Sequence, residues 1–299
     1  AAGHEAEAAE QSRPVILFIN RPLAPATAIA ALRAAVGRQA DLFWMQMPGD
    51  QAPHLRAASI ADFAAATADM IGQAFGDRPV LLAGQGMGAT VALAVKAPTV
   101  ARILAIEPEL VPATAWPVLP TFRKIYRDRP AIRPLLKALY GASPDGADAP
   151  SNLGLVEALA VPVDVVVGEE PLMPQRPVKR APSLVGEPER AALRARPGVR
   201  LRVAPRSGTA LLDQAPDMVG QALREAIAAL AADLSFDPAL LVWAPLTARR
   251  VGYVGRWPRA FAAAYARRNP TAAVFAAEAL AGLEARELDL IVAADLAAT

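Results

Sequence analysis

Apolar runs of strand length alternate with segments of helical periodicity through most of this chain, and this alternation limits the fold more than any other feature. The runs at 14–19 (PVILFI), 80–83 (VLLA) and 100–106 (VARILAI) are continuously apolar, which is typical of strands covered on both faces. The segment Ser59–Phe75 has a Ser at a predicted N-cap, Asp62 three residues later and an apolar stripe of helical spacing. The alternation predicts an α/β fold, a doubly wound and mostly parallel sheet with helices on both faces.

The pattern changes at residue 107 and resumes after residue 150. Residues 107–150 are rich in proline and contain two short helical pieces, near 121–128 and 131–140, so we expect a small helical cap over the edge of the sheet. Further strands are predicted at 161–167 and 199–203, joined by a Pro-rich and Arg-rich crossover, with a helix at 215–232. We therefore predict a flexible N-terminus at 1–13, a main domain at 14–234 and a separate segment at 235–299.

Composition excludes several classes of function. The 299 residues are 54% hydrophobic and 20% charged, and the net charge of +2 is too small to indicate a nucleic-acid partner. The chain has no cysteine, so disulfides and thiolate chemistry are excluded, and its only histidines are His4 and His54. No metal site is predicted. The N-terminal residues lack a secretory pattern and no long apolar run is present, so we expect no membrane span and a cytoplasmic location for a chain of bacterial-like composition.

The stretch VLLAGQGMGATVALA at 80–94 combines an apolar run, a Gly-rich turn and a helix of small residues. This is the form of a nucleophile elbow, whose pattern G-x-S-x-G carries a nucleophilic Ser at its centre. Here the pattern reads Gly84, Gln85, Gly86, Met87, Gly88, so a glycine stands where the nucleophile belongs.

From Pro14 to about Leu230 the chain resembles the α/β-hydrolase family. The resemblance rests on the elbow and on four further stretches in register: MPGD at 47–50, APTVA at 97–101, VPVDVVVG at 161–168 and SGTALLDQAP at 207–216. The third of these resembles the strand that presents the catalytic acid, and the fourth resembles the loop that carries the catalytic histidine. The resemblance implies the fold of that family.

The residues at the three catalytic positions do not match the family. Acyl transfer needs a nucleophile, a base and an acid that orients the base. Gly86 has no side chain, and the histidine position holds Thr209, which cannot act as a base near neutral pH. Glu169 or Glu170 falls near the acid position, without an imidazole to orient. The catalytic triad is therefore predicted to be absent, with Gly86, Glu170 and Thr209 as its degenerate positions.

A small pocket is predicted at the same edge of the sheet. The N–H of Met87 and the loop that begins at Asn20 and Arg21 are expected to frame an anion site at a helix N-terminus, beside Gly86. Such a pocket suits a small acyl or anionic ligand. His54 falls in a loop on the ligand-binding side of the sheet, and it is either an exposed loop residue or a substitute base.

The segment from Arg250 to Leu296 resembles the opening of a class I S-adenosylmethionine-dependent methyltransferase, which implies a Rossmann-like half domain. Gly255 falls in the position of its glycine-rich cofactor loop, and Glu278 matches the acid that holds the ribose hydroxyls. Tyr253 replaces the usual acid of that loop. Because Trp257 and Arg259 stand where glycines let the cofactor approach the backbone, we expect no bound S-adenosylmethionine.

Partner surfaces are predicted from the half sheet and from charge. A half sheet leaves unpaired strand edges, which favours a protein partner or a second copy of the chain. Arginines gather at 176–206 and at 249–268, which is typical of a solvated face and less often of a site for an acidic partner.

We therefore predict a non-catalytic α/β-hydrolase-like pseudoenzyme that serves as a binding, scaffolding or regulatory module, in a biosynthetic or methyltransferase-associated assembly. Two alternatives stay open. One is a hydrolase or acyl-processing enzyme that uses His54 with Glu169 or Glu170. The other is the N-terminal part of a longer methyltransferase fusion.

Overall fold

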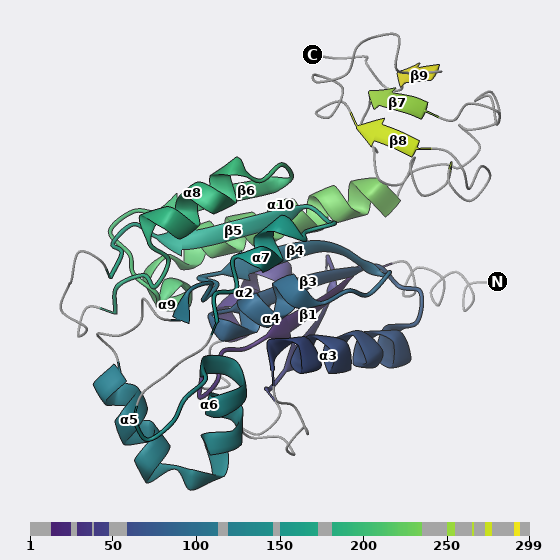
Figure 1. The fold of residues 1–299 in the computed structure, drawn as a ribbon. Coiled ribbons are helices and arrows are strands. Elements are labelled where there is room, and N and C mark those ends of the chain that lie inside the picture. Colours follow the sequence, from purple (N-terminus) through teal and green to yellow (C-terminus); the bar gives the residue numbers. More distant parts are fainter. Residues whose placement is uncertain are drawn as a thin grey trace. The chain divides into compact units, whose positions relative to one another are not determined.

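The six strands of the main domain lie side by side in one parallel sheet in the computed structural model, as the alternation of strands and helices predicts (Figure 1). The structure describes residues 13–24, 29–37, 39–47, 59–112, 119–145, 150–172, 181–234, 250–254, 265, 273–276 and 290–293. The strands are β1 Val15–Ile19, β2 Asp41–Met45, β3 Val80–Gln85, β4 Val100–Ile106, β5 Val163–Gly168 and β6 Val199–Ala204. All neighbours pair in parallel, in the order β2-β1-β3-β4-β5-β6.

The strand order reverses at β1, because β2 lies on one side of it and β3 on the other. In open parallel sheets such a switch point opens a crevice at the carboxyl ends of the strands, where ligands bind. The side chains of β1, β3 and β5 are buried along their whole length, as the continuous apolar runs predict. The elbow therefore lies at the carboxyl end of β3, directly beside this switch point.

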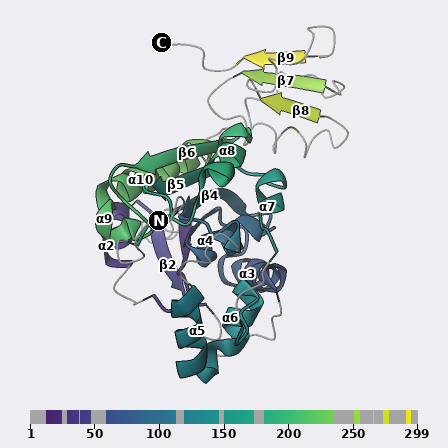
Figure 2. The ribbon, with the colours of Figure 1, turned by 60° about the vertical axis from the view of Figure 1, so that its left-hand side comes forward.

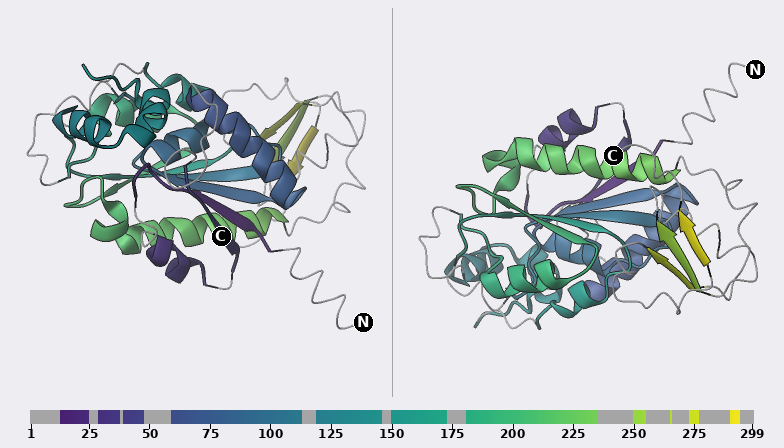
Figure 3. Two further views of the ribbon diagram at one scale, coloured as in Figure 1. Left: turned by 90° about the horizontal axis from the view of Figure 1, so that it is seen from below. Right: turned by 90° about the horizontal axis from the view of Figure 1, so that it is seen from above.

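Helices cover both faces of the sheet (Figure 3). The helices outside the cap are α2 Ile29–Val36, α3 Ile60–Phe75, α4 Met87–Ala94, α7 Gly154–Glu157, α8 Glu187–Ala195, α9 Leu211–Gln214 and α10 Pro216–Leu234. Helices α2 and α10 lie on one face, and α3, α4 and α8 lie on the other (Figure 3). The predicted helix N-cap at Ser59 is confirmed, since the Ser59 hydroxyl accepts a hydrogen bond from the Asp62 N–H at 3.3 Å.

The Pro-rich region contains the two helical pieces that its sequence predicts. They are α5 Leu119–Asp128 and α6 Arg133–Tyr140, with the short helix η3 Pro130–Ile132 between them, and they project from the sheet domain (Figure 2). Helix α6 ends at Gly141, whose φ of 60° is the left-handed conformation that glycine adopts without strain. Leu135, Leu136 and Leu139 of α6 are buried, so this part of the cap joins the main hydrophobic core.

The crossover before β6 contains a helix that the sequence analysis did not predict. Within this Pro-rich and Arg-rich stretch, residues 187–195 form helix α8. Pro188 lies in the first turn, where the missing N–H has no helical partner to lose. Glu187 and Glu189 lie in the same turn and favour it by opposing the helix dipole.

Several of the described arginines of this region are engaged by the protein itself. Arg190 is buried and donates to the carbonyls of Val185 and Gly168. On β6, Arg200 pairs with the fully buried Asp164 at 2.5 Å, and Arg202 pairs with Glu225. Their role in the described part of the chain is therefore structural.

The C-terminal segment forms a second sheet. Contacts divide the chain into the units Ala1–Ile227 and Ala228–Thr299. In the second unit β7 (Arg250–Val254) pairs in parallel with β8 (Ala273–Ala276) and β9 (Leu290–Ala293), in the order β8-β7-β9. This parallel arrangement is that of a Rossmann-like half sheet. The strand predicted at 239–243 and most of the helix predicted at 258–267 lie outside the described residues.

Among the described residues, no helix is both long enough and apolar enough to cross a membrane.

Candidate functional site

The turn between β3 and α4 has the strained backbone of a nucleophile elbow. Gly86 has φ 57° and ψ −128°, a conformation that residues with a side chain rarely adopt. Its N–H donates to the Ile106 carbonyl at 2.9 Å, and its carbonyl accepts from the Ala89 N–H at 3.0 Å. The turn is thereby fixed to β4 on one side and to α4 on the other.

Close backbone contacts hold the start of α4 against the end of β1. A Cβ atom added to Gly88 would lie 2.6 Å from the Asn20 carbonyl oxygen, and one added to Gly84 would lie 2.6 Å from the Gly88 carbonyl oxygen. Only glycine fits at these positions. As a result the first turn of α4 packs directly on the loop that begins at Asn20 and Arg21.

Four of the five predicted pocket residues meet at this point. A Cβ atom built on Gly86 would lie 3.3 Å from the Cβ of Arg21. Met87 follows in the elbow and is completely buried. Asn20 is also buried, and its Oδ1 accepts from the Arg21 N–H at 3.0 Å. The fifth residue, His54, lies outside the described residues.

The position of the nucleophile side chain is filled by a carboxylate that the sequence analysis did not identify. The Oε1 atom of Glu109 lies 2.9 Å from the Cβ position at Gly86. Glu109 comes from the segment that follows β4, and its main-chain carbonyl accepts from the Thr90 hydroxyl of α4 at 3.1 Å. The backbone of Glu109 is thus attached to the same helix whose N-terminus its side chain approaches.

Three groups act on the Glu109 carboxylate. Tyr140, from cap helix α6, donates its hydroxyl to Oε1 at 3.4 Å, while the charge of Arg21 and the backbone N–H of Met87 also favour the charged form of the carboxylate. Burial raises the pKa of Glu109 to about 7, in spite of these three groups, which lower it. Burial also raises the pKa of Tyr140 above its usual value, so Tyr140 stays a protonated donor.

The segments predicted to hold the acid and histidine positions lie side by side. A Cβ atom on Gly168, at the end of β5, would lie 2.8 Å from the carbonyl carbon of Gly208. The Glu169 carboxylate accepts from the Arg206 N–H at 2.7 Å. The backbone N–H of Glu170 donates to the Ser207 carbonyl, and its carbonyl accepts from the Ser183 N–H. The N–H of Thr209 donates to the Ala181 carbonyl at 2.7 Å. Around these positions the described residues include no imidazole.

A second buried carboxyl near this edge was also not anticipated. Glu107 is 1% exposed and accepts from the Gly168 N–H at 2.5 Å, the Ser183 hydroxyl at 2.9 Å and the Leu184 N–H at 3.3 Å. Burial raises its pKa to about 7, while these three hydrogen bonds and the charge of Arg190 lower it. Glu107 therefore joins the end of β4 to the end of β5 and to the crossover.

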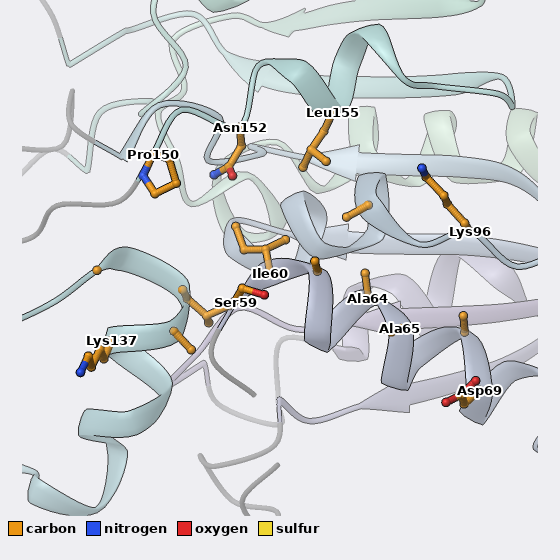
Figure 4. Close-up of a pocket in the computed structure, with 16 residues that line it drawn as sticks. Ser59, Ile60, Ala64, Ala65, Asp69, Lys96, Lys137, Pro150, Asn152 and Leu155 are labelled. Atoms are coloured by element: carbon orange, nitrogen blue, oxygen red, sulfur yellow. The ribbon is translucent and has the colours of Figure 1, made fainter. Parts of the chain in front are cut away.

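Hollows of appreciable size lie away from the elbow, and two of them border the cap or helix α8. A groove of about 910 Å³ runs between α3 and the end of α6 (Figure 4). Its lining includes small alanines such as Ala61, Ala64 and Ala65, together with polar residues such as Lys96 and Asn152. An apolar cavity of about 750 Å³ lies beside α8, lined by residues including Val111, Leu172 and Leu184. Neither hollow contains a triad position.

The other predicted site residues are not placed by the structure. Gly255, Trp257, Arg259 and Glu278 lie outside the described residues, so the absence of a bound cofactor stays a prediction. Tyr253 is in β7, paired with β8 and β9. No group of three metal-ligating side chains occurs within the described ranges.

Comparisons with known proteins agree with this architecture. No protein-family model and no curated protein matches the sequence. Similar solved structures include a hydrolase from Oleispira antarctica (11% identity, TM-score 0.57, 72% of this chain and 91% of that one). They also include an enol-lactonase from Burkholderia xenovorans (12%, 0.55, 72% and 92%) and a thermophilic esterase from Thermogutta terrifontis (18%, 0.51, 72% and 89%). The chain therefore has an α/β-hydrolase fold, and identities this low show the fold alone.

Proposed function

We propose that this chain is a non-catalytic α/β-hydrolase-like protein that acts as a binding module. The observation that carries the proposal is the elbow, where Gly86 supplies no nucleophile and the Glu109 carboxylate lies 2.9 Å from the position of the missing Cβ. An ester carbonyl needs this space to approach a nucleophile. A negatively charged carboxylate there would also repel the oxyanion that forms in acyl transfer.

The histidine position supports the same proposal. Thr209 is the residue in register, and its backbone N–H is held by the Ala181 carbonyl. A hydroxyl cannot take a proton from a nucleophile near neutral pH. The loss of the nucleophile and the base together is what a binding module tolerates and an acyl-transfer enzyme does not.

Ester hydrolysis tests the proposal directly. We expect the unmodified chain to hydrolyse nitrophenyl esters of short and long acyl chains no faster than the buffer. Gly86→Val, which fills the elbow, is expected to give the same background rate, with circular dichroism to check that the variant is folded. A rate above background in the unmodified chain that Gly86→Val abolishes would contradict the proposal.

The alternative of an enzyme with a non-standard site is tested by the same assay. That site would use His54 as the base with Glu169 or Glu170 as its acid. The structure shows the Glu169 carboxylate already accepting from the Arg206 N–H. A hydrolysis rate that His54→Ala removes would favour this alternative. The alternative of a longer methyltransferase fusion is tested by the natural gene. It predicts a reading frame that continues past Thr299 and encodes the further strands of a methyltransferase.

For the second unit we propose association with a partner protein or a second copy. In the described residues β8 and β9 form the edges of the three-stranded sheet, and unpaired strand edges present free N–H and C=O groups. We expect light scattering coupled to size-exclusion chromatography to give a mass above that of one chain, rising with protein concentration. A monomer mass at every concentration would leave only a different protein as the partner.

A further inference from the structure

The cavity of about 750 Å³ beside α8 combines an apolar lining with two carboxyl groups. Leu153, Leu172 and Leu184 supply apolar surface from three separate stretches of the chain. Glu187 and Glu189, in the first turn of α8, also line the cavity, and none of its described lining residues is basic. The volume falls within the range usual for small-molecule pockets, about 300–1,000 Å³. Such a lining suits a ligand that has an apolar body and a positive charge.

Only one of the two carboxyl groups has cationic partners among the described residues. Glu187 is exposed, and its two oxygens accept from Arg190 and Arg194, each at 3.4 Å. Glu189 is only 2% exposed, and its Oε1 atom has no hydrogen-bond partner within the described part of the chain. Buried polar atoms in folded proteins nearly always have a partner, so this oxygen requires an explanation.

The helix accounts for the position of the Glu189 carboxyl group but leaves Oε1 unexplained. Glu189 lies in the first turn of α8, where the helix dipole favours an acidic side chain. Its Oε2 atom lies 2.8 Å from the position that a Cβ atom on Gly186 would take, beside the N-cap residue of the helix. Oε1 remains as an acceptor on a residue that lines the cavity, and a donor on a ligand would pair with it.

We propose that the cavity beside α8 binds an amphipathic amine, with the ammonium group on the Glu189 carboxylate and the apolar chain against Leu153, Leu172 and Leu184. A protonated primary amine has three N–H donors and a positive charge, so it offers Oε1 a charge-assisted hydrogen bond. A neutral alcohol offers a donor without the charge, and a fatty acid places a second carboxylate beside the first. The site is separate from the elbow, so the inference goes beyond the proposed function.

Calorimetric titration of the unmodified protein near neutral pH with octylamine, octanol and octanoate tests the charge preference. We expect octylamine to bind at least tenfold more tightly than octanol, and octanoate to show no measurable binding. Ethylamine keeps the ammonium group and lacks the long chain, so it buries less apolar surface and should bind at least tenfold more weakly than octylamine. Equal affinities for octylamine and octanol would overturn the inference.

Glu189→Gln tests the role of the carboxylate. The amide keeps the shape of the side chain and removes its charge, so the affinity for octylamine should fall at least tenfold while that for octanol changes less than twofold. Glu157→Gln in α7 is the matched control, because Glu157 is exposed and is not among the residues that line the cavity. Its affinity for octylamine should equal that of the unmodified protein. An equal loss in both variants, or no loss in Glu189→Gln, would count against the inference.

The location of the bound amine is tested by amide NMR signals. Octylamine should shift the signals of Leu184 and Glu189 along the same saturation curve as the calorimetry, and shifts confined to other parts of the chain would overturn the inference. Should circular dichroism show that Glu189→Gln is unfolded, Leu184→Trp decides in its place. Leu184 is a half-buried lining residue, so the larger indole fills the cavity and should abolish octylamine binding. Unchanged binding in Leu184→Trp would again contradict the inference.

The unmodified protein gives the last decisive outcome. No binding of octylamine would mean that solvent alone completes the hydrogen bonding of Oε1, and the inference would fail. Ester hydrolysis by the unmodified protein bears only on the proposed function, because the cavity contains none of the triad positions. The two failures are therefore distinguishable.

Discussion

Raising the pH from about 5 to about 8 is expected to lower the free energy of unfolding of this protein. The cause is the pair of carboxyl groups at the carboxyl edge of the sheet, Glu107 and Glu109, whose pKa values burial raises from 4.5 to about 7. Between these values the folded protein holds more protons than the unfolded chain. Stability therefore decreases as the pH rises through this window and is fully present below about pH 4.5.

The expected loss is large for a protein of ordinary stability. A folded-state pKa of about 7 against 4.5 for Glu107 corresponds to about 3 kcal/mol, and Glu109 adds a contribution of the same sign. The charges that face them, Arg190 near Glu107 and Arg21 near Glu109, are already included in these shifts. Glu225 acts at lower pH, because the hydrogen bond from Arg202 lowers its pKa to about 2.

Urea unfolding at a series of pH values measures this effect, with Glu107→Gln and Glu109→Gln as controls. Each amide removes one titrating group and keeps nearly the same shape. At position 107 the amide oxygen can accept from the Gly168 N–H while its NH₂ group faces the Ser183 hydroxyl. Both variants should show a flatter dependence on pH. A slope identical in all three proteins would show that these carboxyls do not cause it.

The fold was accessible from the sequence because its signals are local and redundant. The continuous apolar runs of β1, β3 and β4 each predict a strand covered on both faces, and parallel pairing follows from the helices between them. The elbow was also predictable, because its glycine spacing is visible in the sequence. The structure gives the reason for two of these glycines, since close contacts at Gly84 and Gly88 permit no side chain. Helix α8 was missed because proline in a first turn looks the same in sequence as proline in a loop.

The contents of the site could not be predicted in the same way. Glu109 follows Pro108 in a Pro-rich segment, and nothing in its local sequence shows that its side chain turns back to the elbow. The contact depends on the register of β4 against β3 and on a cap helix that brings Tyr140 to the same carboxylate. Only the positive φ of Glu107 marks this bend, and a dihedral angle is not visible in sequence. The sequence shows the glycine at position 86, and the structure was needed to find the carboxylate beside it.

The packing at the acid and histidine positions leads to the second large prediction, a strong loss of stability in Gly208→Ala. A Cβ atom on Gly208 would lie 2.8 Å from the carbonyl carbon of Ala181 and closer still to its oxygen, which accepts from the Thr209 N–H. Backbone atoms cannot move aside as the end of a flexible side chain can. We expect Gly208→Ala to lower the free energy of unfolding, measured with urea, by about 3 kcal/mol, which is at the upper end of the usual cost of overpacking.

Gly72→Ala in α3 is the matched control, because the added Cβ meets no atom within 4 Å and alanine favours a helix interior. We expect a gain of about 0.5 to 1 kcal/mol there.

A loss in Gly208→Ala no larger than 0.5 kcal/mol would show that the loop at 205–210 yields easily. A large loss would show that the close backbone contact between Gly208 and Ala181 is needed for stability. On the proposed non-catalytic function, a requirement of this kind would explain how the framework persists, because its close backbone contacts hold the sheet edge together whichever residues stand at positions 86 and 209.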